Sequence, residues 1–267
     1  MLKMKFWKMS GAGNDFVLLT GGRRKTAGLR RLARRLCERK LSVGADGLLY
    51  VNGAGRGAVS VRYFNSDGSE AFCGNGSRCA ALWAARSGLA GGRFTLRTLA
   101  GDLPAEIKGP ESVRMGMPDV RKVRLDLRGK FPRGVGRVHF LDTGVPHAVV
   151  PVKGLDRLDV RGLGRSLRFN GAFGPGGANV DFVERRGRVL RVRTYERGVE
   201  DETLACGTGL TAVAVAMTLA GEARPPVALL ARSGETFRVR LTAEKGGASG
   251  IRIQGPAKLV FEGETEC

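Results

Sequence analysis

The sequence predicts an α+β fold made of two related halves, with more strand than helix. Three observations support this prediction: short apolar runs punctuated by Gly, Pro and Asp, a small number of helix-like stretches, and a glycine-rich cysteine segment that occurs twice. A chain of 267 residues that is 42% hydrophobic can form one large domain or two modest ones. Its 41 glycines without a triplet period and its five scattered cysteines exclude a collagen-like chain and a secreted disulfide scaffold.

Runs with strand-like composition recur along the whole chain. They cover residues 5–7, 16–19, 48–51, 59–64, 93–97, 113–117, 138–141, 147–150, 179–184, 189–195, 227–231, 236–242, 250–254 and 257–262. Helical periodicity predicts helices at residues 26–39, 76–87, 155–166 and 207–220. The first of these is typical of a surface helix, because its apolar residues form one stripe and its arginines occupy the other faces.

Two pairs of segments resemble each other. Residues 72–85 and 205–216 both begin around Cys-Gly-polar-Gly and continue as a run of small residues. Residues 13–17 and 178–183 share a shorter Asn-containing pattern, and the order of the two motifs is the same in each half. The repeat predicts two homologous domains that meet at the turn near residue 120, namely residues 1–119 and 120–256.

The chain carries 45 basic and 25 acidic residues, a formal net charge of +20, with a pI near 10.8. Such a balance invites a nucleic-acid hypothesis, but the basic residues alternate with apolar ones, as on the solvent face of half-buried strands. Residues 186–193 are an example of this alternation. We therefore expect no nucleic-acid partner and attribute the charge to surface composition.

No apolar signal segment is expected at the start of the chain, where charges and glycines intervene. Residues 203–221 form a long stretch poor in charge, but its Gly and Thr content and abundant Ala indicate a buried helix and not a membrane span. We expect no membrane association, a cytoplasmic location, and cysteines present as thiols.

Cys73 and Cys206 each stand just before a predicted helix, in a glycine-rich turn. A helix N-terminus offers free N–H groups and partial positive charge, which lower a thiol pKa and bind a carboxylate. Two such thiols on opposite sides of one carbon could remove a proton from one face and deliver a proton to the other. The pair therefore predicts stereochemical inversion next to a carboxylate.

The other cysteines are expected to be inert. Cys37 lies on the apolar stripe of its helix, Cys79 lies inside a helix, and Cys267 ends the chain. No CxxC motif occurs, and only His139 and His147 could supply imidazole, so no metal site is expected.

The chain resembles the diaminopimelate epimerase family over essentially its whole length. The resemblance rests on an ordered series of blocks, each weak alone and specific together: residues 8–17, 44–47, 64–70, 73–79, 144–147, 177–179, 195–198 and 205–209. It implies two domains, each a β-barrel-like sheet around a central helix, with the active site in the cleft between them. The final segment, residues 257–267, is expected to return a strand to the first domain.

The resemblance also implies an activity and a set of site residues. The activity is interconversion of LL- and meso-2,6-diaminopimelate, an amino-acid substrate, without pyridoxal phosphate, metal or other cofactor, by a homodimer. Cys73 and Cys206 match the acid/base pair, and Glu196 and His147 match positions that support catalysis. The positions that match substrate contacts are the side chains of Asn14, Asn65, Asn179, Glu196 and Arg197 and the helix-start residues Gly74, Asn75, Gly207 and Thr208.

Three departures from the family pattern concern the edge of the site. Val145 stands where many relatives carry Asn, Gly47 stands where some carry Gln, and the loop at residues 198–203 is one residue longer than usual. The alternative functions are a proline or hydroxyproline racemase or a double-bond isomerase of the same fold, and more distantly a nucleic-acid-binding protein. Asn14, Asn65, Asn179 and Arg197 favour diaminopimelate, since a proline-sized substrate needs no contacts to a distal amino-acid group.

Overall fold

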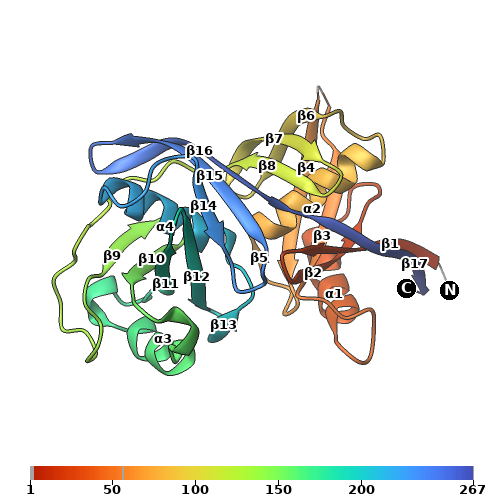
Figure 1. Ribbon diagram of the computed structural model, residues 1–267. Helices are drawn as coiled ribbons and strands as arrows, with labels where there is room; N and C mark the ends of the chain where they lie inside the picture. Colours follow the sequence, from red (N-terminus) through yellow and green to blue (C-terminus); the bar gives the residue numbers. More distant parts are fainter. Residues whose placement is uncertain (1–2, 56, 267) are drawn as a thin grey trace. The chain divides into compact units, whose positions relative to one another are not determined.

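The computed structural model describes residues 3–55 and 57–266 and divides them into two compact units (Figure 1). Unit 1 comprises residues 3–115 and 255–266, and unit 2 comprises residues 116–254. The sequence placed these divisions at 119/120 and 256/257, a few residues later. Cys267 lies outside the described residues.

Unit 1 is a mixed sheet with two helices. Strand β1 pairs antiparallel with β2 and β17, β2 pairs parallel with β3, and β3 pairs antiparallel with β4. Strand β4 then pairs antiparallel with β5 and parallel with β6, and the β6–β7–β8 meander is antiparallel. The elements are β1 (Lys3–Gly11), β2 (Asn14–Leu19), α1 (Thr26–Cys37), β3 (Gly47–Gly53), β4 (Ala58–Asn65), β5 (Glu70–Ala71), α2 (Gly74–Arg86), β6 (Arg93–Thr98), β7 (Gly101–Gly109), β8 (Ser112–Gly116) and β17 (Lys258–Glu266).

Unit 2 repeats this order of strand pairings. The β9–β10, β11–β12, β12–β13, β14–β15 and β15–β16 pairs are antiparallel, and the β10–β11 and β12–β14 pairs are parallel. The elements are β9 (His139–Asp142), β10 (Pro146–Pro151), η1 (Leu155–Arg157), α3 (Val160–Arg168), η2 (Gly171–Phe173), β11 (Asn179–Arg186), β12 (Val189–Glu196), β13 (Asp201–Thr203), α4 (Gly207–Leu219), β14 (Val227–Leu230), β15 (Thr236–Glu244) and β16 (Gly247–Pro256).

One ion pair marks the same place in both units. In unit 1, the Nε and NH2 atoms of Arg62 donate to the two carboxylate oxygens of Glu70 at 2.7 and 2.8 Å. In unit 2, Arg193 binds Glu202 in the same bidentate way, at 2.6 and 2.8 Å. Both arginines lie on the long strand that pairs with the short strand preceding the cysteine helix, so the repeat extends to side-chain geometry.

The helices α2 and α4 are the centres of their units. Residues 74–84 of α2 are all buried, and α4 is buried at residue 207 and from residue 209 to 217. In Figure 1 each of these helices lies among the strands of its own unit. Only small side chains allow strands to approach a helix from several sides, which explains the abundant Gly and Ala. The expectation of a buried helix at 207–220 is confirmed, and no helix in the described part of the chain is long and apolar enough to cross a membrane.

The helices α1 and α3 cover their sheets from outside. In α1 the buried residues are Leu29, Ala33, Leu36 and Cys37, which confirms the predicted apolar stripe. The helix expected at 155–166 is wrong at its start, because residues 155–157 form a separate 3₁₀ turn. The α-helix begins after Asp159, whose carboxylate accepts a hydrogen bond from the Gly162 amide at 2.9 Å and caps the first turn.

Some elements were absent from the sequence prediction. Strand β7 contains Pro104, a residue that weakens any strand pattern, yet its residues 101–106 pair with β6. Strands β5 and β13 are two and three residues long, too short to give a periodic signal.

The expected correspondence between Asn14 and Asn179 is wrong. Asn14 begins β2, the first strand of the parallel β2–β3 pair. Asn179 begins β11, which is the second strand of the parallel β10–β11 pair. Since Phe16 lies opposite Gly47 and His147 lies opposite Asn179, the position of Asn179 corresponds to Gly47 and that of Asn14 corresponds to Val145. Asn at a strand start followed by alternating apolar residues is a common local pattern, and here it arose at two different places in the repeat.

Candidate active site

Cys73 caps helix α2. Its Sγ atom accepts a hydrogen bond from the Gly76 amide at 3.4 Å, and the cysteine is a partly exposed thiol. Because the first amides of a helix have no partner within the helix, Gly74 and Asn75 are placed to present N–H groups next to this sulfur. The arrangement can bind a carboxylate beside a thiol.

A chain of hydrogen bonds runs behind Cys73 and involves no group that readily loses a proton. The buried Arg78 guanidinium donates to Asn75 Oδ1 at 2.6 Å, and Asn75 Nδ2 donates to Asn14 Oδ1 at 2.8 Å. Asn14 Nδ2 then donates to Asp46 Oδ2 at 2.7 Å. A guanidinium only donates and a carboxylate only accepts, so both amides have one possible orientation. Burial lowers the pKa of Arg78 to about 10, which leaves it protonated at neutral pH.

Asn65 lies opposite Gly47 in the β3–β4 ladder. Its Oδ1 atom accepts from the Tyr63 hydroxyl at 2.8 Å, and its Nδ2 atom donates to Ser69 Oγ at 2.9 Å. A Cβ atom on Gly47 would lie 2.4 Å from the Tyr63 ring and 2.5 Å from the Phe64 carbonyl oxygen. The absence of a side chain at position 47 is therefore required by the packing of Tyr63.

Cys206 caps helix α4 in the same way, with the Gly209 amide 3.4 Å from its Sγ atom. The Thr208 hydroxyl lies 3.2 Å from the same sulfur. Only 7% of Cys206 is exposed, and burial, followed by the negative charges of Glu196 and Asp181, raises its pKa well above the usual thiol value. The expectation that the helix start lowers this pKa is wrong for Cys206, because desolvation and the carboxylates outweigh the helix amides.

His147 connects Cys206 to a buried carboxylate. Its Nδ1 atom lies 2.7 Å from Asp181 Oδ2, and its Nε2 atom lies 3.1 Å from Thr208 Oγ1. Asp181 and His147 are both fully buried, and the second carboxylate oxygen accepts from the Thr194 hydroxyl at 2.7 Å. The imidazole and the thiol thus share one hydroxyl group.

Asn179, Glu196 and Arg197 lie around the same histidine and cysteine. Asn179 Oδ1 accepts from the Arg197 amide at 2.8 Å, and its Nδ2 atom donates to the Pro146 carbonyl at 3.1 Å. Glu196 Oε2 accepts from the Thr203 hydroxyl at 2.9 Å. No carboxylate within residues 3–55 and 57–266 forms an ion pair with the Arg197 guanidinium, so this half-buried cation is available to an external anion.

The extra residue in the loop after Arg197 is accommodated by ion pairs to α3. Glu200 adopts a positive φ of 57° and binds Arg168 at 3.1 Å, while Asp201 binds Arg161 at 2.6 Å. Both acids are therefore neutralised by arginines of the outer helix and add no unpaired charge beside Arg197.

The model of the diaminopimelate epimerase family matches residues 6–123 and 139–259. A diaminopimelate epimerase of Aquifex aeolicus (strain VF5) is 38% identical over 279 residues, which cover 97% of each chain. The chain belongs to the diaminopimelate epimerase family. Two solved structures share the fold at lower identity and confirm the predicted architecture of two pseudo-symmetric domains. A PhzF-family phenazine biosynthesis protein of Bacillus anthracis has a TM-score of 0.77 (17% identity, 100% of both chains), and a probable proline racemase of Agrobacterium radiobacter K84 has 0.74 (19%, 98% of this chain and 93% of that one).

The residues that the epimerase resemblance singled out form two hydrogen-bonded groups. In unit 1, Asn14 and Asn75 are bonded to each other next to Cys73, while Asn65 is held by Tyr63 and Ser69. In unit 2, direct contacts connect His147, Asn179, Arg197, Cys206 and Thr208. Glu196 belongs to the second group through its charge, which acts on Cys206.

Four polar residues of these groups were missed by sequence analysis: Asp46, Arg78, Asp181 and Thr194. Asp181 carried the clearest signal, because a lone acid within the run Asn179–Val183 falls among buried apolar residues. Its partner His147 lies 34 positions earlier in the chain, and only the parallel register of β10 and β11 brings the two together.

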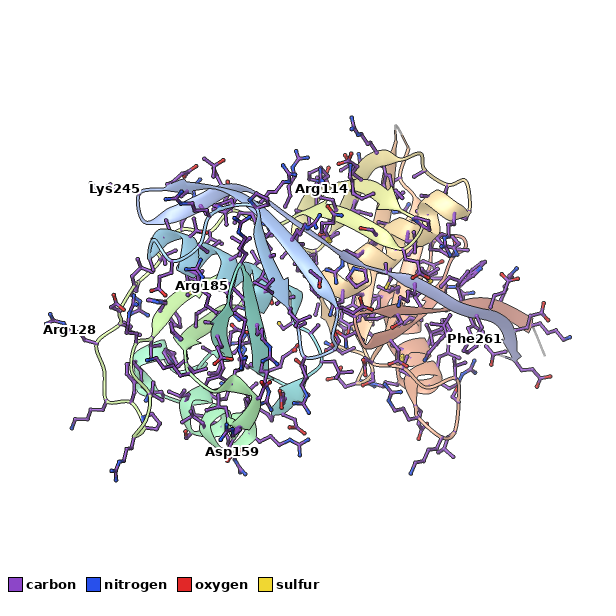
Figure 2. All side chains as sticks on the ribbon, viewed as in Figure 1. Arg114, Arg128, Asp159, Arg185, Lys245 and Phe261 are labelled. Atoms are coloured by element: carbon purple, nitrogen blue, oxygen red, sulfur yellow. The ribbon has the colours of Figure 1, made fainter. Side chains whose placement is uncertain are left out.

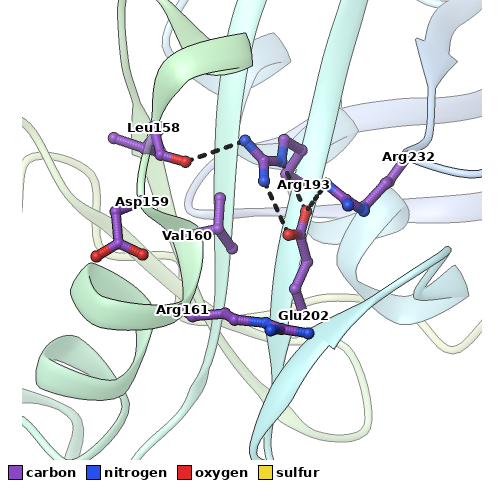
Figure 3. A pocket seen from close by; sticks show the side chains of 7 residues that line it. All are labelled: Leu158, Asp159, Val160, Arg161, Arg193, Glu202 and Arg232. Atoms are coloured by element: carbon purple, nitrogen blue, oxygen red, sulfur yellow. Dashed lines mark hydrogen bonds and ion pairs between the residues drawn. The ribbon is translucent and has the colours of Figure 1, made fainter.

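A surface hollow of about 310 Å³ in unit 2 lies among Leu158, Asp159, Val160, Arg161, Arg193, Glu202 and Arg232 (Figure 3). Its arginines are already paired with acids, since Glu202 binds both Arg193 and Arg232 and Asp201 binds Arg161. It contains none of the residues of the cysteine sites, so we do not regard it as the active site.

No three His, Cys, Asp or Glu side chains within the described residues are arranged to hold a metal ion. The basic side chains are spread widely over each unit, as Arg114 in unit 1 and Arg128, Arg185 and Lys245 in unit 2 illustrate in Figure 2. Many arginines form ion pairs with neighbouring acids, among them Arg191 with Asp156 and Arg137 with Glu222. This dispersal does not resemble a phosphate-binding stripe.

Proposed function

We propose that the chain is a cofactor-independent diaminopimelate epimerase, which interconverts LL- and meso-2,6-diaminopimelate for the synthesis of lysine and peptidoglycan precursors. The observation that carries the proposal is the pair of cysteine caps. Each unit places a cysteine thiol at the start of its central helix, where the sulfur accepts a hydrogen bond from the third amide of that helix. The family relationship over nearly the full length identifies the substrate class.

Inversion requires one thiolate and one thiol, and the two environments supply that difference. Cys206 is buried next to the carboxylates of Glu196 and Asp181, which favour its neutral form. Cys73 is only partly buried and interacts electrostatically with the buried Arg78 guanidinium, so we assign it as the base. In one direction, therefore, the Cys73 thiolate takes the α-proton and the Cys206 thiol delivers a proton to the opposite face. The reverse reaction exchanges the two roles.

The developing negative charge at the α-carbon extends into the adjacent carboxylate. Amide N–H groups at the two helix starts, from Gly74 and Asn75 and from Gly207 and Thr208, would bind that carboxylate as its charge grows. Neutral amides suit this position because they add no competing base.

The distal end of diaminopimelate carries a second amino-acid group. Arg197, which lacks an ion-pair partner in the described chain, is suited to bind the distal carboxylate bidentately. Glu196 and the amide oxygens of Asn14, Asn65 and Asn179 are suited to accept hydrogen bonds from the ammonium groups.

The cellular setting is also a proposal. Cys37, Cys73, Cys79 and Cys206 are present as thiols, which fits a reducing cytoplasm. The family relationship suggests a homodimer, and sedimentation velocity at micromolar concentration would test that state.

The proposal is tested by α-proton exchange of LL-diaminopimelate in D₂O, followed by NMR with reductant and no added cofactor. We expect the wild type to exchange the proton and produce the meso form. Cys73→Ala and Cys206→Ala should each lower inversion by at least about a thousand-fold, because each removes one of two obligatory proton carriers. The control is Cys37→Ala, which removes a buried thiol outside both sites.

Two results would contradict the proposal. Inversion that survives in either cysteine variant would exclude the two-thiol mechanism. Exchange of the α-proton of proline without exchange of diaminopimelate would assign the chain to a different substrate class within the same fold.

A further inference from the structure

Asp181 is a fully buried carboxylate that the proposed reaction does not use directly. It lies on β11 between apolar neighbours, and its only charged or titratable hydrogen-bond partner among the described residues is His147. Its carboxylate also approaches the first turn of α4, since a Cβ atom on Gly209 would lie 2.3 Å from Oδ1. A buried carboxylate in this position is unfavourable unless a specific donor satisfies it.

The contact with Asp181 determines which nitrogen of His147 carries a proton. Asp181 Oδ2 lies 2.7 Å from Nδ1, and Oδ1 already accepts from Thr194. An ionised carboxylate can only accept, so a bare Nδ1 would place two acceptors in repulsive contact. Nδ1 therefore carries the proton.

The opposite side of the ring gives the same answer independently. Asn179 Oδ1 accepts from the Arg197 amide, so Nδ2 is the end of that amide that lies 3.5 Å from His147 Nε2. The Thr208 hydroxyl lies 3.1 Å from Nε2 as well. The fixed Asn179 donor makes Nε2 the accepting nitrogen of the neutral ring, and the Thr208 hydroxyl, which can donate or accept, then donates to it.

We propose that Asp181 is a positioning residue that holds His147 in the Nδ1–H form, so that His147 and Thr208 carry protons to and from Cys206. The inference rests on the proposed function, because it assigns Cys206 to proton transfer. It goes beyond that function by naming the route through which a buried thiol regains its proton.

The proton balance of this relay is complete. After Cys206 has given its proton to the substrate carbon, it is a thiolate that needs a new proton. Water supplies this proton, and it also receives the α-proton that Cys73 has taken. The proton enters at Thr208, the half-buried member of the relay, and is held on His147 Nε2 as an imidazolium. His147 then gives this Nε2 proton to Thr208 Oγ1, and the Thr208 hydroxyl gives its own proton to the Cys206 sulfur. The products are a thiol, an intact threonine and a neutral imidazole. The Asp181 carboxylate, which faces Nδ1 at 2.7 Å, stabilises the imidazolium while the ring holds that proton.

The need for such a route follows from burial. Only 7% of Cys206 is exposed, so direct exchange with solvent is restricted. Thr208 is half-buried and lies 3.2 Å from the sulfur, at the open end of the relay. The resting enzyme holds Cys206 as a thiol, so the relay acts after each turnover and not before the first.

The first test reads the protonation of the ring directly. The chain has two histidines, so ¹⁵N-histidine labelling gives two imidazoles in a long-range ¹H–¹⁵N spectrum. His139 Nδ1 accepts from the Asp126 amide at 3.1 Å, which makes it an internal reference with the proton on Nε2. We expect a proton on Nδ1 of His147, far downfield because it faces a carboxylate. A bare Nδ1 on His147 in the wild type would overturn the inference without any variant.

The second test uses Asp181→Asn, with Asp156→Asn as a matched control. Asp156 is an exposed acid of the same unit, bound to Arg191. In Asp181→Asn the Nδ1 proton should move upfield or leave Nδ1, while the His139 signals stay in place. Steady-state kcat should fall by about a hundred-fold or more with KM changed less than about three-fold. The control should match the wild type in both spectrum and kcat.

A single-turnover measurement separates a relay from simple structural support. Cys206 already carries its proton before the first turnover. In Asp181→Asn, quench-flow should therefore show a first turnover per site at nearly the wild-type rate, followed by slow turnover. Thr208→Val should behave in the same way, and Thr208→Ser, which keeps the hydroxyl, should recover most of the steady-state rate. Equal loss in the first and later turnovers would overturn the relay.

The outcomes also separate this inference from the proposed function. If the wild type does not invert diaminopimelate, the proposed function fails regardless of the histidine spectrum. If the wild type inverts it but His147 carries no proton on Nδ1, the epimerase proposal stands and the role of Asp181 is rejected.

Discussion

The starts of helices α2 and α4 have the same backbone geometry but different polar surroundings. In each case a cysteine caps the helix by accepting a 3.4 Å hydrogen bond from the glycine three positions later. Behind Cys73 the chain of partners is a guanidinium, two amides and a carboxylate. Around Cys206 the chain is a hydroxyl, an imidazole and a carboxylate.

The two chains of hydrogen bonds differ in whether their donors and acceptors can exchange roles. Every hydrogen bond from Arg78 to Asp46 has one allowed direction, so the unit 1 chain holds charge and orientation but cannot transfer a proton. The hydroxyl and the imidazole of unit 2 can each donate or accept, so that chain can reverse. A duplicated fold has thus kept the helix cap in both copies and diverged in the groups behind it.

The largest expected effect comes from placing a methyl group at the third helix position in each unit. A Cβ on Gly209 would lie 2.3 Å from Asp181 Oδ1, a short, doubly hydrogen-bonded carboxylate with no room to move. Gly209→Ala should therefore displace Asp181 from His147 and reduce kcat about a thousand-fold, or about 4 kcal/mol in the activation barrier. Steady-state epimerisation with purified protein measures this.

The matched change in unit 1 is Gly76→Ala. There the nearest atom to the new Cβ is the end of the Leu49 side chain at 2.9 Å, which can rotate at a moderate packing penalty of about 1–3 kcal/mol. We expect a lower urea midpoint and a much smaller loss of kcat than in Gly209→Ala. Equal losses of kcat in the two variants would mean that the third helix position, and not Asp181, controls the rate.

The next effect concerns the fifth position after each cysteine, where unit 1 has Arg78 and unit 2 has Thr211. Both side chains donate to the carbonyl four residues earlier, Arg78 to Gly74 and Thr211 to Gly207. Arg78 also holds Asn75, and it is completely buried. Arg78→Met should lower the free energy of unfolding by about 3 kcal/mol, because it leaves buried acceptors without a donor.

The comparison variant is Thr211→Val, which removes a single neutral hydrogen bond and should lower the free energy of unfolding by about 1 kcal/mol. Urea unfolding followed by circular dichroism measures both. An Arg78→Met variant as stable as Thr211→Val would show that the buried guanidinium serves the site alone and not the fold.

The parts of the fold that sequence analysis predicted are those encoded locally. The caps at Cys73 and Cys206, the small-residue helices after them and the apolar stripe of α1 each lie within one short segment, and all were found. The start of α3 was missed because the capping role of Asp159 competes with an apolar pattern that begins earlier. The β7 strand was missed because Pro104 interrupts its pattern.

The parts of the site that sequence analysis missed depend on contacts between distant segments. The role of Asp181 can be recognised only when β10 and β11 are aligned in parallel, with His147 opposite Asn179, because this register brings Asp181 to His147. Arg78 received no role in the sequence analysis, yet it is fully buried. The repeat was recognised from its helices but misaligned at its asparagines, since strand pairing and not local similarity determines which positions correspond.

The smallest expected effect is the contribution of the interior thiols of unit 1 to the loss of stability at alkaline pH. The sixth position after each cysteine is Cys79 in α2 and Ala212 in α4. Burial raises the pKa of Cys79 to about 12 from 9.0, and it does the same to Cys37. Below pH 9 both states of the protein hold the thiol proton, so these groups do not make stability depend on pH. Between pH 9 and about 12 only the unfolded state loses it, and each thiol should then lower the free energy of unfolding by about 1.4 kcal/mol per pH unit.

Cys79→Ala gives α2 the residue that α4 already carries at this position, and it should remove the share of that pH dependence that belongs to one thiol. At pH 8 the variant should be less stable than the wild type, because a buried side chain is shortened. The difference in the free energy of unfolding between the two proteins should become smaller as the pH rises to 10.5. Urea midpoints at both pH values, under reductant and nitrogen, measure the change. A gap that stays constant would mean that the thiol at position 79 ionises as readily in the folded chain as in the unfolded one, which is incompatible with its complete burial inside α2.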